Sequence, residues 1–289
     1  MYIKMVDGVK IFVDIDGASL RANGPSLDSF PTMILIHGGP GVNDHSGYKS
    51  THDVLKNIAQ LLYVDLRGNG RSDSGESSSW NLEQWAEDIH DICQQLGIEK
   101  PILLGSSFGG FVAMKFAIMY PDNLSGLVLS STSAKKDFER QYKVFERLGG
   151  AKAVEAARGC FENPSPATFE RYGEVCGPLL KKEQPDPDIA SRTIRRMEVA
   201  RHFVSGEMEN LDFLAEVSRI KCPTLVLGGE DDASTPIEDQ EDIVNALGAQ
   251  VVVFKRYSNC GHVPQNDVAR KEAFSDIQAF VSEHCCVGA

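Results

Sequence analysis

The chain alternates short apolar runs with longer segments in which apolar residues recur at helical spacing. Short apolar runs are typical of buried strands, and the helical spacing is typical of helices packed on one side. The strands predicted in this way are residues 33–36, 101–104, 126–129, 224–227 and 251–254. The helices that alternate with them are residues 53–60, 83–96, 110–120, 236–247 and 267–283. This alternation predicts an α/β fold with a mostly parallel, doubly wound sheet that has helices on both faces.

The first residues follow a different pattern. Two short segments of alternating apolar and polar residues are joined at Asp7-Gly8, a pair that favours a tight turn. We expect a hairpin here, which adds an antiparallel edge to the sheet.

The stretch between the strands at 126–129 and 224–227 is helical and interrupted. Its predicted helices are residues 137–148, 151–158, 168–175 and 188–203, with proline-containing breaks at 163–166 and 184–187. Residues 133–210 carry 14 basic and 13 acidic side chains, whereas the whole chain has a net charge of −12. This change in charge indicates a boundary. We therefore expect a core of residues 1–132 and 215–289, and a helical insertion of residues 133–214.

Composition excludes several classes of partner. A chain of 289 residues with 42% hydrophobic residues can bury a large core, and its net charge of −12 argues against binding to nucleic acid. No apolar stretch reaches the roughly 18 residues of a membrane span, and the first residues lack a signal-peptide pattern, so we expect a cytoplasmic protein without a membrane partner. Seven scattered cysteines favour reduced thiols. No C-x-x-C spacing suggests zinc, so we expect neither a metal nor a cofactor.

Ser107 is the strongest candidate for a catalytic side chain. It lies at the centre of a Gly-x-Ser-x-Gly motif at residues 105–109, between the predicted strand at 101–104 and the predicted helix at 110–120. A sharp strand-to-helix turn of this kind is a nucleophile elbow, which exposes the serine hydroxyl. The amides at the start of the helix favour negative charge beside it.

Such a serine requires an acid and a histidine further along the chain, in that order. Asp231 and Asp232 follow the strand at 224–227, and His262 follows the strand at 251–254. Because the carboxyl ends of parallel strands meet at one edge of a sheet, these distant loops can converge. Either aspartate could orient the imidazole of His262, which would take the proton of Ser107.

A second motif, His-Gly-Gly-Pro-Gly at residues 37–41, follows the strand at 33–36. Acyl transfer places negative charge on a carbonyl oxygen, and fixed backbone amides stabilise that charge. A glycine-rich loop can bring its amides close because no side chain obstructs it. Gly38 and Gly39 are the candidates in this loop, and Phe108, after the serine, supplies the other amide.

These motifs together resemble the α/β-hydrolase family, and the loop at 37–41 resembles its proline iminopeptidase group, which removes N-terminal proline from peptides. The family pattern Gly-x-x-Asp, with a proline four residues after the aspartate, implies that Asp232 is the acid. The resemblance also implies that Gly39 supplies the loop amide and that the helical insertion is a cap over the serine. Two features differ from the iminopeptidase pattern: Phe108 stands where that group has tryptophan, and the insertion contains no tryptophan.

We therefore expect an enzyme, a serine hydrolase that cleaves an amide or ester through an acyl-enzyme, with a small molecule or short peptide as substrate. An aminopeptidase must hold an ammonium group with carboxylates, and Glu198 and Glu207 of the insertion are the candidates. Ion pairing with nearby arginines is the alternative for both. The alternative functions are a carboxylesterase or lactonase acting on a small apolar acyl group, and a ligand-binding homologue with slow turnover.

Overall fold

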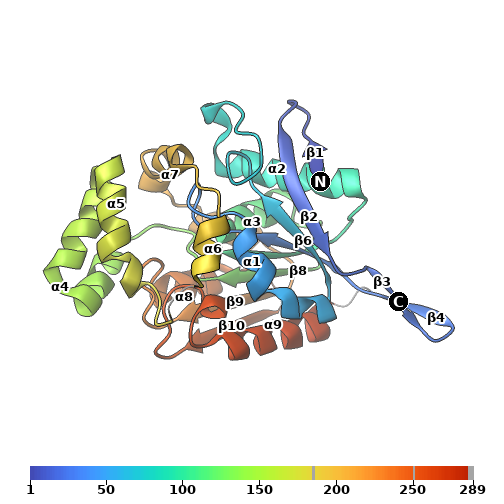
Figure 1. The fold of residues 1–289 in the computed structure, drawn as a ribbon. Helices are drawn as coiled ribbons and strands as arrows, with labels where there is room; N and C mark the ends of the chain where they lie inside the picture. The colour runs from blue at the N-terminus through green and yellow to red at the C-terminus, as the bar shows by residue number, and fades with distance from the viewer. Residues whose placement is uncertain (184–185, 250, 286–289) are drawn as a thin grey trace.

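The computed structural model describes residues 1–183, 186–249 and 251–285. Within these residues, the main sheet has the strand order β1-β2-β6-β5-β7-β8-β9-β10 (Figure 1). Its strands are β1 (Tyr2–Lys4), β2 (Lys10–Asp16), β5 (Thr32–Ile36), β6 (Gln60–Asp65), β7 (Ile102–Ser106), β8 (Gly126–Ser130), β9 (Thr224–Gly229) and β10 (Val252–Tyr257). Strand β5 pairs in parallel with β6 and β7, and the pairs β7–β8, β8–β9 and β9–β10 are also parallel. The pairs β1–β2 and β2–β6 are antiparallel. The predicted parallel sheet with an antiparallel hairpin at its edge is confirmed.

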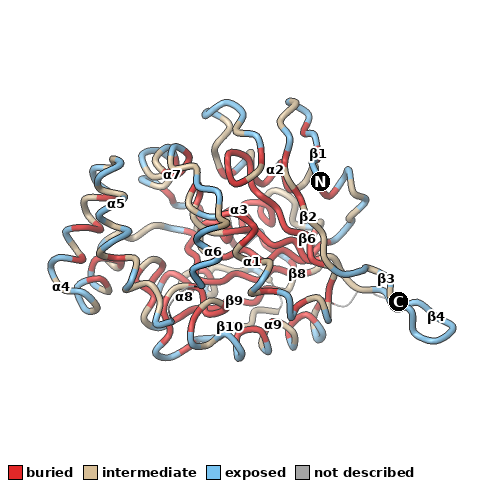
Figure 2. The backbone as a smooth tube through the Cα atoms, in the orientation of Figure 1, coloured by how far each residue is buried: buried red, intermediate tan, exposed pale blue. Residues whose placement is uncertain are grey.

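Helices cover both faces of this sheet. One set is α2 (Leu82–Leu96), α3 (Phe108–Met119) and α8 (Ile237–Ala246), and the other is α1 (Ser46–Thr51), the 3-10 turn η1 (Asp53–Asn57) and α9 (Arg270–His284). In β5, Ile34 and Ile36 belong to the hydrophobic core of the first set, and Met33 and Leu35 belong to that of the second. Successive strand residues point to opposite faces, so a continuous apolar run fills both cores. Figure 2 shows the strands as the buried centre of the molecule.

Two strand regions were missing from the prediction. Strand β6 follows η1, which ends at Asn57, so the predicted helix at 53–60 is too long. Strands β3 (Leu20–Asn23) and β4 (Ser26–Ser29) form a separate two-stranded sheet. The turn between them contains Gly24-Pro25, a pair that signals a turn, and this signal was available in the sequence.

The order of the strands explains where loops meet. From β5 the chain continues to β6 on one side, and it then crosses to β7 on the other side. At such a switch point the loops after the two central strands diverge and leave a crevice between them. The loop after β5 holds the His-Gly-Gly-Pro-Gly motif, and the turn after β7 holds Ser107.

The stretch between β8 and β9 is helical, and α4 and α5 extend away from the sheet (Figure 1). Its helices are α4 (Phe138–Glu162), α5 (Pro166–Val175), α6 (Pro187–Arg192) and α7 (Met197–Val204). The helices predicted at 137–148 and 151–158 are the two arms of α4, which is kinked at Gly150. The predicted break at 163–166 separates α4 from α5, while Gln184 and Pro185 of the second break lie outside the described residues.

The single helix predicted at 188–203 is wrong, because α6 and α7 are separate. Between them the amide of Ile194 donates to Asp44 Oδ2 at 2.9 Å, and the amide of Arg196 donates to the carbonyl of Gly41 at 2.7 Å. These amides bind acceptors of the core in place of helical carbonyls. The segment between α6 and α7 therefore attaches the insertion to the loop after β5.

Two further expectations concern the described residues. The cysteines at 93, 160, 176, 222 and 260 have free and buried thiols, Cys285 is also buried, and Cys286 lies outside this part of the chain. In the same part, no helix combines the length and apolar character needed to cross a bilayer.

Candidate active site

Ser107 occupies a sharp turn between β7 and α3. Its φ of 55° and ψ of −123° are unusual for a residue with a side chain, and strain of this kind clusters at functional sites. A Cβ on Gly105 would collide with the backbone of Gly109, and a Cβ on Gly109 would collide with the carbonyl of Ile36. The two glycines of the motif are therefore required by close backbone contacts, which bring the start of α3 against the end of β5.

His262 lies between β10 and α9, with its Nδ1 atom 2.8 Å from Asp232 Oδ2. Asp232 is fully buried and also accepts hydrogen bonds from the amides of Ser234 and Thr235 and from the Thr235 hydroxyl. Burial raises the pKa of the Asp232 carboxyl, but the attraction of His262 and these hydrogen bonds outweigh it, so the pKa lies below its ordinary value. An ionised Asp232 keeps the proton on Nδ1, which leaves Nε2 as the basic nitrogen.

The carboxylate of Asp231 contacts the insertion and so joins it to the core. Its Oδ1 lies 2.6 Å from Arg147 Nη1, and its Oδ2 lies 2.9 Å from Lys182 Nζ. Of the two adjacent carboxylates that the sequence offered, Asp232 is thus the one that contacts the histidine.

The segment after β8 connects the serine turn to the histidine loop. The amide of Ser107 donates to the carbonyl of Ser130 at 2.9 Å, and the hydroxyl of Thr132 donates to the carbonyl of Ser107 at 2.8 Å. Between these two positions, Ser131 Oγ accepts the amide of Val263 at 2.9 Å. Ser131 and Val263 both have positive φ angles, of 48° and 63°. Residues 130–132 thus bind the backbone of Ser107 and the backbone of Val263, which follows His262. Their residue types form no recognisable motif, so the sequence assigned them no role.

Ser107 is partly exposed, and its hydroxyl makes no hydrogen bond in the described part of the chain. Among the described residues neither this hydroxyl nor His262 Nε2 has a hydrogen-bond partner, so the bond needed for proton transfer is not formed in this structure. In free enzymes such bonds are often long and shorten when substrate binds.

The glycine loop after β5 lies against the serine turn. A Cβ on Gly38 would be 3.0 Å from the carbonyl oxygen of Ser106 and 3.2 Å from the Cβ of Ser107. Gly39 has a φ of 44°, which favours glycine. Phe108 is the first residue of α3, so its amide has no acceptor within the helix. The loop and the helix start are thus brought together, while the roles of Gly39 and Phe108 as oxyanion donors stay predictions.

His37 fixes the start of the glycine loop. It is buried, its Nε2 accepts the amide of Leu66 at 3.2 Å, and its Nδ1 lies 3.0 Å from the carbonyl of Gly38. This pattern requires a neutral ring with the proton on Nδ1. Burial lowers the pKa of the His37 imidazole, which agrees with that state.

A buried cluster beside this loop has the residue types of a metal site. Asp44, His45 and Asp65 bring their ligand atoms within 4.8 Å of one another. Protein donors already use these atoms: His45 Nδ1 lies 2.8 Å from Asp65 Oδ1, Asp44 Oδ2 accepts the amide of Ile194, and Asp65 Oδ2 accepts the amide of Arg71. The cluster therefore acts as a junction between two loops of the core and the insertion.

The two glutamates proposed as ammonium ligands lie in different surroundings. Glu207 Oε2 accepts the amide of Leu82, the first residue of α2, at 3.0 Å. Burial raises the pKa of the Glu207 carboxyl above its ordinary value. Glu198 is exposed in the first turn of α7. Glu207 thus has a structural partner, and a substrate-binding role for either residue stays a prediction.

An aromatic cluster attaches α7 to the serine turn. The ring of Phe203 in α7 lies 5.0 Å from that of Phe108 and 5.9 Å from that of Trp85, measured between centroids. Phe108, which stands where the proline iminopeptidase group has tryptophan, is therefore buried beneath the insertion.

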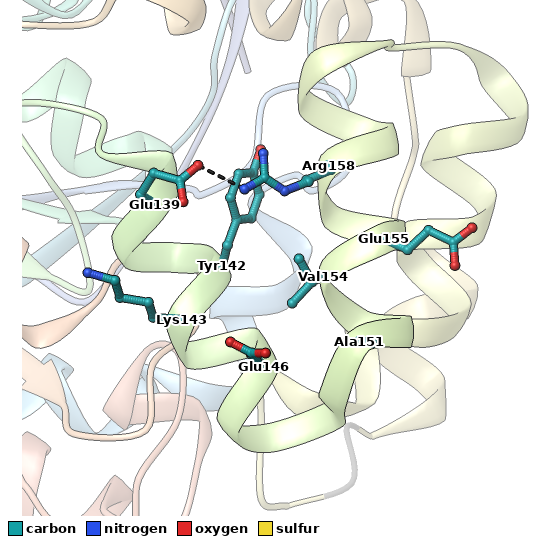
Figure 3. Close-up of a pocket in the computed structure, with 8 residues that line it drawn as sticks. All are labelled: Glu139, Tyr142, Lys143, Glu146, Ala151, Val154, Glu155 and Arg158. Atoms are coloured by element: carbon teal, nitrogen blue, oxygen red, sulfur yellow. Dashed lines mark hydrogen bonds and ion pairs between the residues drawn. The ribbon is translucent and has the colours of Figure 1, made fainter.

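A hollow of about 460 Å³ opens between the two arms of α4. Figure 3 shows charged side chains at its rim, among them Glu139 and Arg158, which form an ion pair. None of the residues that line it is a candidate catalytic residue, so this hollow is separate from the site around Ser107.

Comparison with known proteins places these features in context. A family model described as the alpha/beta hydrolase fold matches residues 31–267. The proline iminopeptidase PfmaB of Pestalotiopsis fici is 28% identical over 284 residues, covering 92% of this chain and 99% of that protein. A solved proline iminopeptidase from Mycobacterium smegmatis and a solved esterase from Rhodococcus each superpose with a TM-score of 0.76 at 18% identity, with 98% of both chains covered. The two structural likenesses show a shared fold.

Proposed function

The chain belongs to the alpha/beta hydrolase fold family, and from this premise we propose that it is a serine hydrolase that cleaves an amide or ester through an acyl-enzyme. The observation that supports the proposal most is the contact of His262 with the buried Asp232. The loop that holds His262 and the turn that holds Ser107 are both bound to the segment after β8.

In the proposed first step, Ser107 Oγ attacks the carbonyl carbon of the substrate and its proton passes to His262 Nε2. Asp232 stabilises the imidazolium that forms. The negative charge on the carbonyl oxygen is stabilised by the backbone amides of Gly39 and Phe108.

The carbon–nitrogen or carbon–oxygen bond then breaks, and the leaving group takes the proton from His262. In the second step a water molecule gives its proton to the same nitrogen and attacks the acyl-enzyme. The acid is released when Ser107 Oγ recovers the proton. The residues between 133 and 214 form the cap that excludes bulk water during both steps.

The substrate class we propose is a peptide with an N-terminal proline. The glycine loop at 37–41 and the relative named as a proline iminopeptidase support it. In this proposal Glu198 and Glu207 hold the substrate's ammonium group.

A carboxylesterase or lactonase is the second candidate. The engagement of Glu207 with α2 favours it, since a carboxylate bound to a backbone amide and with a raised pKa is a weaker ligand for an ammonium group. The esterase among the structural neighbours has the same fold.

Turnover of a proline anilide and of short aryl esters tests these alternatives. A kcat/KM of ~10⁴ M⁻¹s⁻¹ or higher on the anilide supports the peptidase, and rapid ester cleavage without anilide cleavage supports the esterase. We expect Ser107→Ala to lower kcat by about 10⁴–10⁶-fold while thermal unfolding stays cooperative. Full activity in this variant contradicts the mechanism. A wild-type protein that is inert to every acyl substrate and to a fluorophosphonate supports the slow-turnover binding protein instead.

A further inference from the structure

The main chain at His262 is bound directly to the insertion. Its amide donates to the carbonyl of Leu180 at 2.6 Å. A Cβ on the preceding residue, Gly261, would collide with the same carbonyl oxygen. The backbone of the histidine loop and the segment after η3 (Gly177–Leu179) are therefore in contact without intervening side chains.

A buried carboxylate reinforces this contact from the core side. Asp267 lies between the turn η6 (Pro264–Asn266) and α9, and its side chain is fully buried. Its Oδ2 accepts the amide of Gly261 at 2.7 Å. Its Oδ1 accepts two amides of the insertion, those of Lys182 at 2.8 Å and Glu183 at 2.9 Å.

One side chain thus links the residue before the histidine to the insertion. Hydrogen bonds between a carboxylate and amides are charge-assisted, and they are short and directional. Removal of such an acceptor leaves buried amides unpaired, which carries a free-energy penalty for each of them. The arrangement of Asp267 therefore favours a state in which the insertion is docked and the histidine loop is fixed at the same time.

We propose that Asp267 is a positioning residue that sets the place of His262 relative to Ser107 by holding the histidine loop against the insertion. The inference rests on the proposed function, since it assigns His262 as the base. In this state the insertion is docked on the core and His262 is held where it can act as the base.

The chain offers a matched control in Asp231. This carboxylate also joins the core to the same segment of the insertion, through Lys182 Nζ. These contacts lie between side chains at a partly exposed edge. Within the described residues, the carboxylate oxygens of Asp231 do not contact the histidine loop. Asp267→Asn and Asp231→Asn therefore weaken the same junction, but only the first change reaches His262.

The experiment measures the rate at which a small fluorophosphonate labels Ser107, together with kcat and KM for an aryl ester, in both variants. The probe reports activation of the serine by His262 and needs little of the substrate pocket. We expect Asp267→Asn to lower the labelling rate and kcat by about 10–100-fold, because small displacements of catalytic groups have effects of this size. KM should stay within about 3-fold, and Asp231→Asn should change the labelling rate by less than about 3-fold.

Hydrogen exchange provides the second measurement. In Asp267→Asn, the amides of residues 180–183 and 260–263 should exchange faster together, whereas Asp231→Asn should leave residues 260–263 protected. If Asp267→Asn fails to fold, Asp267→Glu keeps the carboxylate one methylene further out, and we expect it to fold with an intermediate labelling rate.

The inference is overturned if a folded Asp267→Asn protein labels at the wild-type rate, even with a lowered melting temperature, because the residue would then act on stability alone. Equal losses in Asp267→Asn and Asp231→Asn would also overturn it. Failure of the proposed function itself has a different outcome, namely a wild-type protein that the probe does not label at all.

Discussion

At the scale of single residues, neighbours decide what a carboxylate does. Asp231 and Asp232 are adjacent and chemically identical, yet one binds Arg147 and Lys182 at the edge of the insertion, and the other is buried against His262. Residues 230 and 231 form a turn, and the two side chains have different partners. The contact with His262 gives Asp232 a depressed pKa despite its burial.

This difference predicts a large effect of one substitution and a small effect of the other. Asp232→Asn should lower kcat by about 10⁴-fold, because an amide at this position favours the wrong tautomer of His262. Asp231→Asn should change kcat by less than about 3-fold and stability by about 0–1 kcal/mol, as is usual for exposed ion pairs. Steady-state kinetics on an aryl ester and urea unfolding measure both effects. A larger loss of kcat in Asp231→Asn would reassign the acid.

At the scale of elements, glycine positions show which contacts are tight. Gly109 in α3 has the carbonyl oxygens of Ile36 and His37 where a Cβ would be placed. Gly173 in α5 has open space around the same position. The first glycine allows a helix to approach a strand end, whereas the second has no packing role.

The two glycines therefore provide a pair of opposite predictions. Gly109→Ala should destabilise the protein by about 1–3 kcal/mol, because the helix must shift to admit the methyl group. Gly173→Ala should stabilise it by about 0.5–1 kcal/mol, since alanine restricts the unfolded chain and suits a helix. The midpoints of urea unfolding measure the stability of each variant relative to the wild type. Equal effects of the two substitutions would mean that the contact of α3 with the end of β5 is loose.

Much of the element pattern was predictable because it is local. The alternation of strands and helices in the core and the kink between the two arms of α4 follow from apolar spacing and from glycine. The break between α6 and α7 does not, since its cause is the pair of acceptors on Asp44 and Gly41, about 150 residues away in the chain. Sequence spacing alone favours a continuous helix there.

At the scale of the whole molecule, buried histidines couple stability to pH. His52 is fully buried in the core between the sheet and α9, with its ring 4.4 Å from that of Tyr48 and 5.1 Å from that of Phe274, between centroids. Burial, assisted by the charge of Arg270, lowers the pKa of His52 to about 3. The folded protein thus holds a neutral imidazole that the unfolded chain protonates near its ordinary pKa of 6.5.

The sign follows from the protons bound in each state. Between pH 6.5 and 3 the unfolded state binds the extra proton, so the contribution of His52 is fully present above about pH 6.5 and is lost as the pH falls. Between pH 7 and pH 5 this loss amounts to about 2 kcal/mol. Urea unfolding at both pH values measures how much the free energy of unfolding falls between pH 7 and pH 5. This fall should be smaller in His52→Gln than in the wild type, by about the same 2 kcal/mol. The same drop in both proteins would contradict the assignment.

The sequence by itself determined most elements of the core, the order of serine, acid and histidine, and the glycine loop, because these depend on periodicity and on short motifs; strand β6 was not among them. Only the tertiary structure decided which aspartate faces His262, how residues 130–132 hold the serine turn and the histidine loop, and that a backbone amide engages Glu207. It also revealed Asp267 as a link to the insertion. The physical reason is that a polar side chain takes its role from the donors around it, and here those donors come from segments far apart in the chain.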